Sequence, residues 1–288
     1  MIGHHHRTSA LVLCLFTATA LLATPTQAAT SAMPRSTTPT DRIDIYEVDP
    51  LLDGALTGAL WAASAAIVAL RSDTATLTCH PCKAANLNAL DRWVVNRSPD
   101  NVRTLTDVMV AAAIAAPIAL SAIEAATSED SGRWNAFWVD TLVFAEAMAL
   151  TISLNQAVKH IVQRPRPYTY QLAAEDSNQV EADATNSFYS GHTASAFTGA
   201  VALASTFTYR HPESALRPLV WAGSLTFAAA TGVGRVLGGD HFWTDVMAGA
   251  VLGAAVGWWV PGSHRREAKQ TASLVQVHAL PNGFLVRF

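Results

Sequence analysis

Residues 188–197 read Phe-Tyr-Ser-Gly-His-Thr-Ala-Ser-Ala-Phe and lie where a polar, acidic loop meets a long apolar segment. Ser190 is typical of a helix N-cap, because its side-chain oxygen accepts a backbone N–H at the start of a helix. Gly191 lets the backbone approach an anion closely, and His192 places a titratable ring at the positive end of the helix dipole. Because Ser-Gly is also an ordinary helix cap, this stretch alone leaves both an anion-binding and a purely structural role open.

Two further clusters of charged residues lie on either side of this stretch. Six residues separate Lys159 from Arg166, which Pro167 follows. Five residues separate Arg235 from His241, and three more separate His241 from Asp245. Each cluster lies at an end of an apolar segment, so the sequence predicts that distant helix ends converge on one site. Cations at a helix C-terminus are also explained by the helix dipole alone, which is the structural alternative for the first cluster.

With these clusters in this order, the chain resembles the superfamily of type 2 phosphatidic acid phosphatases and vanadium haloperoxidases. The family pattern is Lys-x6-Arg-Pro, then Pro-Ser-Gly-His, then Ser-Arg-x5-His-x3-Asp. Tyr189 stands where the family has Pro, adding a ring that the substrate could contact, and Gly234 stands where it has Ser. The resemblance covers Lys159 to Asp245. It implies an all-α, six-helix bundle of the phosphatidic acid phosphatase type 2/haloperoxidase kind.

The resemblance also implies a phosphohistidine mechanism. His241 is then the nucleophile, Asp245 its orienting partner, and His192 the general acid for the leaving alcohol. The residues expected to surround the phosphoryl oxygens are Lys159, Arg166, Ser190, Gly191 and Arg235. Their three cations suit a reaction whose transition state is stabilised mainly by charge placement. The spacing by itself places His241 and Asp245 on one helix face, which an ordinary helix-start ion pair would also explain.

The composition favours a helical protein and excludes some partners. Half of the residues are hydrophobic, only 14% are charged, and the net charge is -3. The abundance of alanine favours helix over sheet. No basic field for nucleic acid is present, so we expect no nucleic-acid partner. The sequence contains no zinc, magnesium or nucleotide motif, so we predict no metal site and no cofactor.

The chain divides into four predicted regions. Residues 1–28 have the basic start, apolar run and small cleavage residues of a signal peptide, with an uncleaved membrane anchor as the alternative. Residues 29–50 form a linker and docking segment, and residues 51–262 form the helical bundle. Residues 263–288 form a tail with a small hairpin or terminal strand, because Pro281-Asn282-Gly283 is a turn signal.

Six apolar helical segments are expected within the bundle. They are about Leu51–Leu70, Val102–Ala126, Asn135–Gln163, Gly191–Thr208, Leu216–Leu237 and Phe242–Val260. Cys79 and Cys82 lie in the connection after the first of them, without a second pair of metal ligands nearby. In an exported protein this spacing favours a short structural disulfide between them.

The predicted helices do not decide whether the protein is embedded in a membrane or soluble, nor which substrate it acts on. Their apolar runs are close to the ~20 residues needed to span a bilayer, although Asp140 and Glu146 would then have to face the bundle interior. The protein is expected in the cell envelope, either associated with the inner membrane or periplasmic. The predicted function is a metal-independent phosphomonoesterase acting on a lipid phosphate, a lipid pyrophosphate or a small phosphate ester. The alternatives are a vanadate-dependent haloperoxidase, a soluble periplasmic non-specific acid phosphatase and a non-catalytic bundle. The sequence does not specify an oligomeric state.

Overall fold

The computed structural model describes residues 45–71, 73–79, 81–95, 100–172 and 180–266, together with the backbone of two C-terminal strands. The predicted signal peptide (1–28) and the linker as far as residue 44 lie outside the described residues. Residues 45–49 precede the first helix. Within them, Tyr46 is buried against Val143, Ala147 and Val260, and its hydroxyl is 2.7 Å from that of Thr206.

The described residues contain seven α-helices. They are α1 (Pro50–Ala69), α2 (Ala89–Arg92), α3 (Asp100–Thr127), α4 (Arg133–Val162), α5 (Gly191–Arg210), α6 (Arg217–Leu237) and α7 (Trp243–Ser263). The six long helices begin and end within three residues of their expected bounds. The expected count of six was too low, because α2 has only four residues and therefore shows no apolar period.

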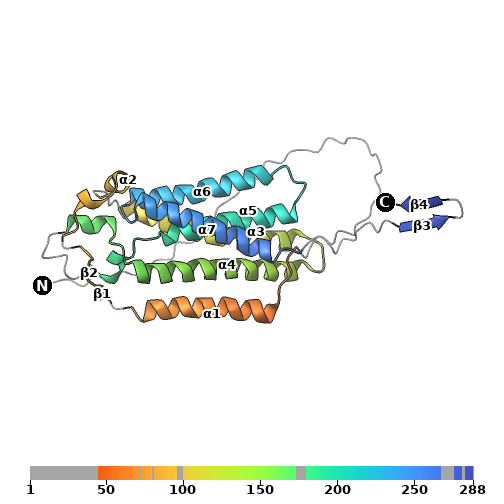
Figure 1. Ribbon diagram of the computed structural model, residues 1–288, viewed down its shortest axis with the longest axis horizontal. Coiled ribbons are helices and arrows are strands. Elements are labelled where there is room, and N and C mark those ends of the chain that lie inside the picture. The colour runs from red at the N-terminus through yellow and green to blue at the C-terminus, as the bar shows by residue number, and fades with distance from the viewer. Residues whose placement is uncertain are drawn as a thin grey trace. The chain divides into compact units, whose positions relative to one another are not determined.

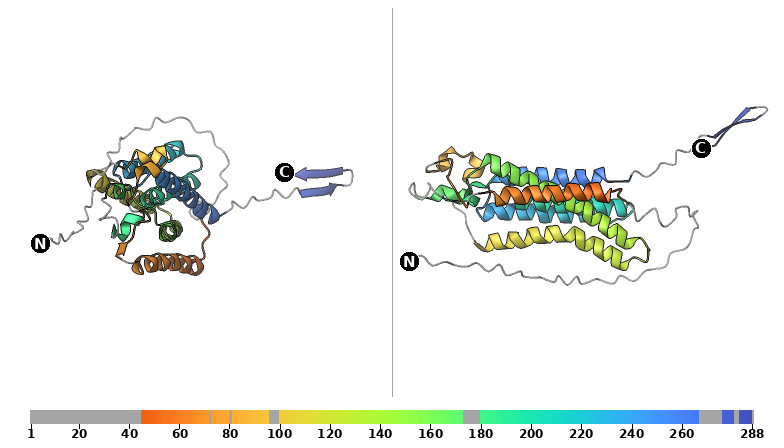
Figure 2. Two further views of the ribbon diagram at one scale, coloured as in Figure 1. Left: turned by 60° about the vertical axis from the view of Figure 1, so that its left-hand side comes forward. Right: turned by 90° about the horizontal axis from the view of Figure 1, so that it is seen from below.

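Helix α5 lies at the centre of the bundle and contacts α3, α4, α6 and α7 (Figure 1). Helix α1 packs along α4, and Figure 2 shows it at the edge of the bundle. Helices α5 and α7 approach so closely that their backbones are in direct contact at glycines of α7. A Cβ added at Gly253 would lie 2.2 Å from the carbonyl oxygen of Ala194, and one at Gly249 would lie 2.7 Å from that of Ser190. Glycine is required at these positions because any side chain would separate the two helices.

Four of the long helices are apolar and long enough to cross a membrane. The segments are Pro50–Ala69, Asn101–Thr127, Arg133–Gln171 and Trp243–Ser263. Only 11% of the apolar window of the first segment is buried, so most of its side chains face outward. Exposed large side chains on these helices include Trp61, Trp138, Trp258 and Trp259. Such exposed apolar surface fits association with a membrane.

The acidic residues expected inside the third long helix do have partners in the bundle. Asp140 is buried and accepts a hydrogen bond of 2.6 Å from Nη2 of Arg210. Glu146 lies 2.9 Å from Nε2 of His264, just after α7. These pairs lie at the end of α4 where the helix begins.

Two short antiparallel strand pairs accompany the helices. Strand β1 (Thr74–Ala75) pairs with β2 (Val180–Glu181), and β3 (Gln276–Leu280) pairs with β4 (Gly283–Arg287). Short 3₁₀ segments follow α4 and β2, namely Pro167–Gln171 and Ala182–Thr185. The first strand pair joins the connection after α1 to the loop before α5.

Candidate active site

The predicted site residues come from four helix ends at one end of the bundle. The end of α4, the start of α5, the end of α6 and the start of α7 lie there, together with β1, β2 and α2 (left side of the bundle in Figure 1). Helices α5 and α7 begin at this end, whereas α4 and α6 finish at it. The site therefore combines two positive helix starts with basic residues from two helix ends.

His241 is fully enclosed, with 1% of its surface exposed. Its Nδ1 atom lies 2.7 Å from the carbonyl oxygen of Ser187. A carbonyl oxygen can only accept a hydrogen bond, so Nδ1 carries the proton and Nε2 keeps its lone pair. Among the described residues, Nε2 has no hydrogen-bond partner. The ring is thus held in the tautomer in which Nε2 can act as a nucleophile.

Asp245 does not form the direct hydrogen bond to His241 that the sequence suggests. Its Oδ2 atom is 3.8 Å from Nδ1 of His241, beyond hydrogen-bond distance. The same oxygen accepts the Ser187 hydroxyl at 2.5 Å and the Phe242 backbone N–H at 2.9 Å. Asp245 therefore positions the loop that carries the Ser187 carbonyl, and the orientation of His241 follows from that loop.

His192 lies at the start of α5 and contacts an acid that the motifs do not include. Its Nε2 atom is 2.9 Å from Oδ1 of Asp107, on α3. The same oxygen is 3.0 Å from Nη1 of Arg235. Burial, followed by the charge of Arg235, lowers the pKa of His192 to about 4, although Asp107 acts in the opposite direction.

The arginines of the site are held by acidic residues. Arg166 donates to the Asp183 carboxylate at 2.8 Å, and Arg235 lies 3.1 Å from the carboxylate of Asp240. Asp240 is buried and also lies 3.1 Å from Nε of Arg103. Burial raises the pKa of Asp240, while the three arginines oppose that rise. These pairs fix both motif guanidinium groups before any substrate binds.

Lys159 lies against the start of α5. A Cβ added at Gly191 would be 3.6 Å from its Nζ atom and 2.7 Å from the side-chain oxygen of Asn155. Asn155 in turn donates to the Tyr189 carbonyl oxygen at 2.8 Å. Glycine at position 191 therefore makes room for the ammonium group beside the helix N-terminus.

Ser190 does not offer its polar groups to an anion in the way the sequence suggests. Its hydroxyl is 2.9 Å from that of Thr193 and caps α5, and its backbone N–H donates to the carbonyl oxygen of Asp245 at 3.1 Å. The expected phosphate contact from the Ser190 N–H is therefore wrong. The N–H of Gly191 has no partner among the described residues, as expected of a first-turn amide.

The two departures from the family pattern have different explanations. Tyr189 is 1% exposed, so its ring is a core side chain and does not line the site as suggested. A Cβ at Gly234 would lie 2.3 Å from Cγ2 of Thr106, so a serine there would collide with this threonine. The Thr106 hydroxyl accepts a hydrogen bond of 3.1 Å from Nη1 of Arg235. Thr106 thus supplies a hydroxyl next to Arg235 where Gly234 supplies none.

Four other ionisable residues predicted for the site act on the pKa of His241. The pKa of His241 is held well below its ordinary value, mainly by burial and secondly by these four ionisable groups. These groups are Arg166, Lys159, Arg235 and His192. A neutral imidazole surrounded by cations is the arrangement that a nucleophile for a phosphate ester requires.

Part of the sequence is similar to a known protein family. Residues 140–269 match the family model of the PAP2 superfamily. A similar solved structure is described as the crystal structure of the first transmembrane PAP2 type phosphatidylglycerolphosphate phosphatase from Bacillus subtilis. It is 21% identical over 74% of this chain and 92% of that chain, with a TM-score of 0.43. No curated protein matches the sequence.

One buried network beneath the PAP2 motifs has no counterpart in the sequence prediction. Arg164 donates to Asp91 at 2.9 Å and to Thr244 at 2.7 Å, and it also pairs with Asp245. Its guanidinium carbon lies 4.3 Å from the centre of the Phe242 ring. Asp91 is 0% exposed, so α2 is tied to the start of α7 through charged groups.

Three of the residues that sequence reasoning missed lie outside the segment that matches the PAP2 model. Asp91, Thr106 and Asp107 precede residue 140, and no short motif links them to the histidines. Asp240 was adjacent to a predicted site residue and could have been suspected from that position alone. The signal for Asp107 is weaker, namely an acid in the first turns of an apolar helix.

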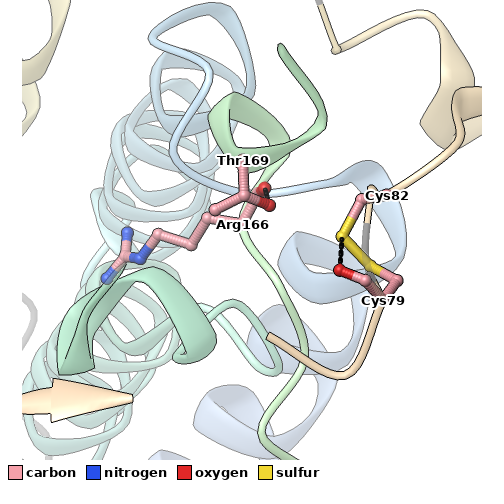
Figure 3. The surroundings of a disulfide bond; sticks show 4 residues. All are labelled: Cys79, Cys82, Arg166 and Thr169. Carbon is pink, nitrogen blue, oxygen red and sulfur yellow. Dashed lines mark hydrogen bonds between the residues drawn. A yellow bond between two sulfur atoms is a disulfide. The ribbon is translucent and has the colours of Figure 1, made fainter. Parts of the chain in front are cut away.

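Cys79 and Cys82 form a disulfide in the connection that follows β1. Figure 3 shows Arg166 and Thr169 in its surroundings, with the Arg166 side chain pointing away from the sulfur atoms. The Thr169 hydroxyl donates to the Arg166 carbonyl oxygen at 2.7 Å. The disulfide therefore lies near the backbone of Arg166, which is expected to bind phosphate, without contacting its guanidinium group.

Proposed function

We propose that this protein is a metal-independent phosphatase that hydrolyses phosphate esters of membrane lipids through a phosphohistidine intermediate. One observation carries the proposal. The Nδ1 atom of His241 is bonded to the Ser187 carbonyl oxygen at 2.7 Å, which leaves Nε2 with a lone pair inside a group of cations. The PAP2 segment supports the same chemistry.

In the first step, Nε2 of His241 attacks the phosphorus atom and forms an N–P bond. The bond between phosphorus and the ester oxygen breaks, and its electron pair stays on the leaving oxygen. His192 supplies the proton that this oxygen takes up. Lys159, Arg166 and Arg235 stabilise the negative charge on the other phosphoryl oxygens. A bound phosphate dianion raises the pKa of His192 above the value of about 4 and so favours its acidic form.

In the second step, water attacks the same phosphorus atom. The N–P bond breaks and its electron pair returns to Nε2 of His241. His192, now neutral, accepts the proton of the attacking water, and inorganic phosphate leaves. Both histidines then regain their starting protonation states.

The helices support a lipid substrate over a small soluble ester. Four segments are long and apolar enough to cross a membrane, and α1 leaves most of its apolar surface exposed. An active site at the end of such helices lies at the depth of lipid head groups. With the predicted signal peptide, this supports a location at the membrane of the cell envelope. Sodium carbonate washing of membranes tests the point, because a soluble acid phosphatase would appear in the wash.

The variant His241→Ala tests the mechanism. We expect hydrolysis of p-nitrophenyl phosphate to fall about a thousandfold or more. Wild-type protein mixed with a ³²P-labelled phosphate ester and quenched in alkali should carry labelled phosphohistidine, and the variant should carry none. His211→Ala, at the opposite end of α5, is the matched control and should retain both signals. Activity of His241→Ala near the wild-type level would eliminate the proposed mechanism.

Vanadate separates the phosphatase from its haloperoxidase alternative. As an analogue of five-coordinate phosphorus, it should inhibit the hydrolysis competitively. Peroxide-dependent bromination of a dye by vanadate-loaded protein, without phosphatase activity before loading, would favour the haloperoxidase instead.

A further inference from the structure

Three side chains that commonly bind metal ions meet at the end of the bundle opposite the candidate active site. They are Asp53 in the first turn of α1, Glu146 on α4 and His264 directly after α7. One ligand atom of each lies within 4.8 Å of those of the other two. Helix α7 has 21 residues and separates this cluster from His241 by roughly 30 Å, the length of such a helix.

The two carboxylates of this cluster share one imidazole. Nε2 of His264 is 2.9 Å from Oε2 of Glu146, and its Nδ1 is 4.0 Å from Oδ2 of Asp53. The three side chains are only 12–14% exposed. Two carboxylates and one imidazole carry a net negative charge whether or not the ring is protonated. Holding this excess charge away from water is costly unless a further cation accompanies it.

The ring nitrogens of His264 show where that cation belongs. Nδ1 lies 3.3 Å from the carbonyl oxygen of Glu47, which can only accept a hydrogen bond, so Nδ1 carries a proton. In the neutral ring, Nε2 then directs its lone pair at the carboxylate of Glu146. Two lone pairs that face each other need a cation between them. A carbonyl oxygen bonded to the second ring nitrogen is also the usual support of a metal-binding histidine.

The donor atoms favour zinc among the common divalent cations. Imidazole nitrogen is a good ligand for zinc, whereas magnesium and calcium prefer sites made wholly of oxygen. Zinc bonds to nitrogen and carboxylate oxygen at about 2.0–2.2 Å, so a tetrahedral ion holds its ligand atoms roughly 3.4 Å apart. The separations within the cluster, from 2.9 Å to at most 4.8 Å, bracket this value. Small rotations of the carboxylates therefore complete the ligand set.

The backbone already brings the surrounding segments together. The N–H of Glu47 donates to the carbonyl oxygen of His264 at 2.8 Å, and the N–H of Arg266 donates to that of Ile45 at 2.9 Å. The segment before α1 is thus paired with the segment after α7. The ligands are fixed by this pairing and by the packing of α1 on α4.

We propose that Asp53, Glu146 and His264 bind a zinc ion, with water as the fourth ligand. The ion links α1 and α4 to the end of α7 and stabilises the bundle at the end remote from the phosphate chemistry. This role is structural and separate from the proposed hydrolysis, which needs no metal. No short motif reveals the ligands, because Glu146 and His264 are 118 positions apart.

Zinc titration of the full chain, treated with EDTA and held in detergent, tests the inference. We expect the Tm of the wild type to rise by about 5 °C when free zinc exceeds the Kd of the site a hundredfold. Magnesium or calcium at the same concentration should leave Tm unchanged. Glu146→Gln keeps the shape of the side chain and its contact with His264 but removes the ligand charge, so zinc should not raise its Tm.

His211→Ala is the matched control, because His211 also lies 2.9 Å from a glutamate, Glu124, but is not part of the three-residue cluster. Zinc should stabilise this variant as it does the wild type. Calorimetric titration should show one zinc equivalent fewer for Glu146→Gln and His264→Ala than for the wild type and His211→Ala.

Equal stabilisation of the wild type and Glu146→Gln by zinc would overturn the inference, because the ion would then bind elsewhere. A wild type that zinc does not stabilise would overturn it as well, and His264 would then serve only as an ion-pair partner. Stabilisation by calcium or magnesium in place of zinc would contradict the assignment of the imidazole as a ligand.

Discussion

Oδ1 of Asp107 lies 2.9 Å from Nε2 of His192 and 3.0 Å from Nη1 of Arg235. One carboxylate oxygen on α3 therefore connects the proposed general acid with an arginine that we propose binds phosphate. Because a carboxylate favours the charged form of a neighbouring imidazole, Asp107 raises the pKa of His192 against burial and the nearby cations. Asp107 is thus a positioning residue with a measurable electrostatic effect.

Replacing this acid should change the pH dependence of the reaction. His192 must carry a proton to assist the leaving group, so activity is lost as pH rises through its pKa in the substrate complex. Asp107→Asn removes a charge that raises this pKa, so the alkaline limb of the kcat profile should move to lower pH by about one unit. Asp130→Asn, in the loop that follows α3, serves as the control. An alkaline limb at the wild-type position would contradict the assignment of His192.

Gly191→Ala should damage phosphate binding without unfolding the protein. Its Cβ would meet the Asn155 side-chain oxygen at 2.7 Å, and the displaced Asn155 would disturb the loop and Lys159. We expect kcat/KM for p-nitrophenyl phosphate to fall about 10- to 100-fold. Gly223→Ala has no atom within 4 Å of the added Cβ and is the matched control. Equal kinetics for both variants would show that Gly191 does not shape the anion site.

Thr106 and Gly234 should behave as a compensating pair. Thr106→Ala removes a hydrogen bond of 3.1 Å to Arg235, and kcat/KM should fall about fivefold, because Asp107 and Asp240 still hold the arginine. Gly234→Ser alone should destabilise the protein, since its Cβ would lie 2.3 Å from the threonine methyl group. The double variant relieves that collision and restores a hydroxyl, so it should recover activity relative to Thr106→Ala. Additive losses in the double variant would refute this pairing.

Gly253→Ala should destabilise the bundle. Its Cβ would lie 2.2 Å from a backbone carbonyl oxygen of α5, which cannot rotate away, and overpacking of this kind typically costs about 1–3 kcal/mol. Thermal unfolding in detergent measures the effect. Gly58→Ala, on the open side of α1, has no atom within 4 Å of its Cβ and should be neutral or slightly stabilising. A Gly253→Ala protein as stable as the wild type would disprove the close contact of the two helices.

The sequence motifs predicted the ionisable residues of the site better than the residues that hold them in place. The positions of Lys159, Arg166, His192, Arg235 and His241 relative to helix ends were readable, because apolar runs and caps mark those ends in sequence. The helix bounds were readable for the same reason. The hydrogen-bond partner of Nδ1 of His241 could not be predicted, because every residue has a backbone carbonyl and the sequence does not show which one lies near the ring.

The missed contacts depend on tertiary packing. Asp91 reaches Arg164 across 73 sequence positions, and Thr106 reaches Arg235 across 129. Nothing in the local pattern of either acceptor distinguishes it from an ordinary polar residue at a helix. The direct bond from Asp245 to His241 failed as a prediction because position on one helix face does not specify which acceptor lies nearer the ring.

The backbone contact between α5 and α7 has a bearing on how such a protein can acquire new specificity. His192 lies in the first turn of α5, and His241 lies two residues before α7 begins. Glycines such as Gly253, which allow the two helices to approach closely, therefore help to set the distance between the two imidazole rings. Substitution of these glycines would change the distance between the two histidines and so disturb the reaction itself. Diversification is therefore expected on α3, where Thr106 and Asp107 contact Arg235 and His192 and can change without altering the distance between α5 and α7.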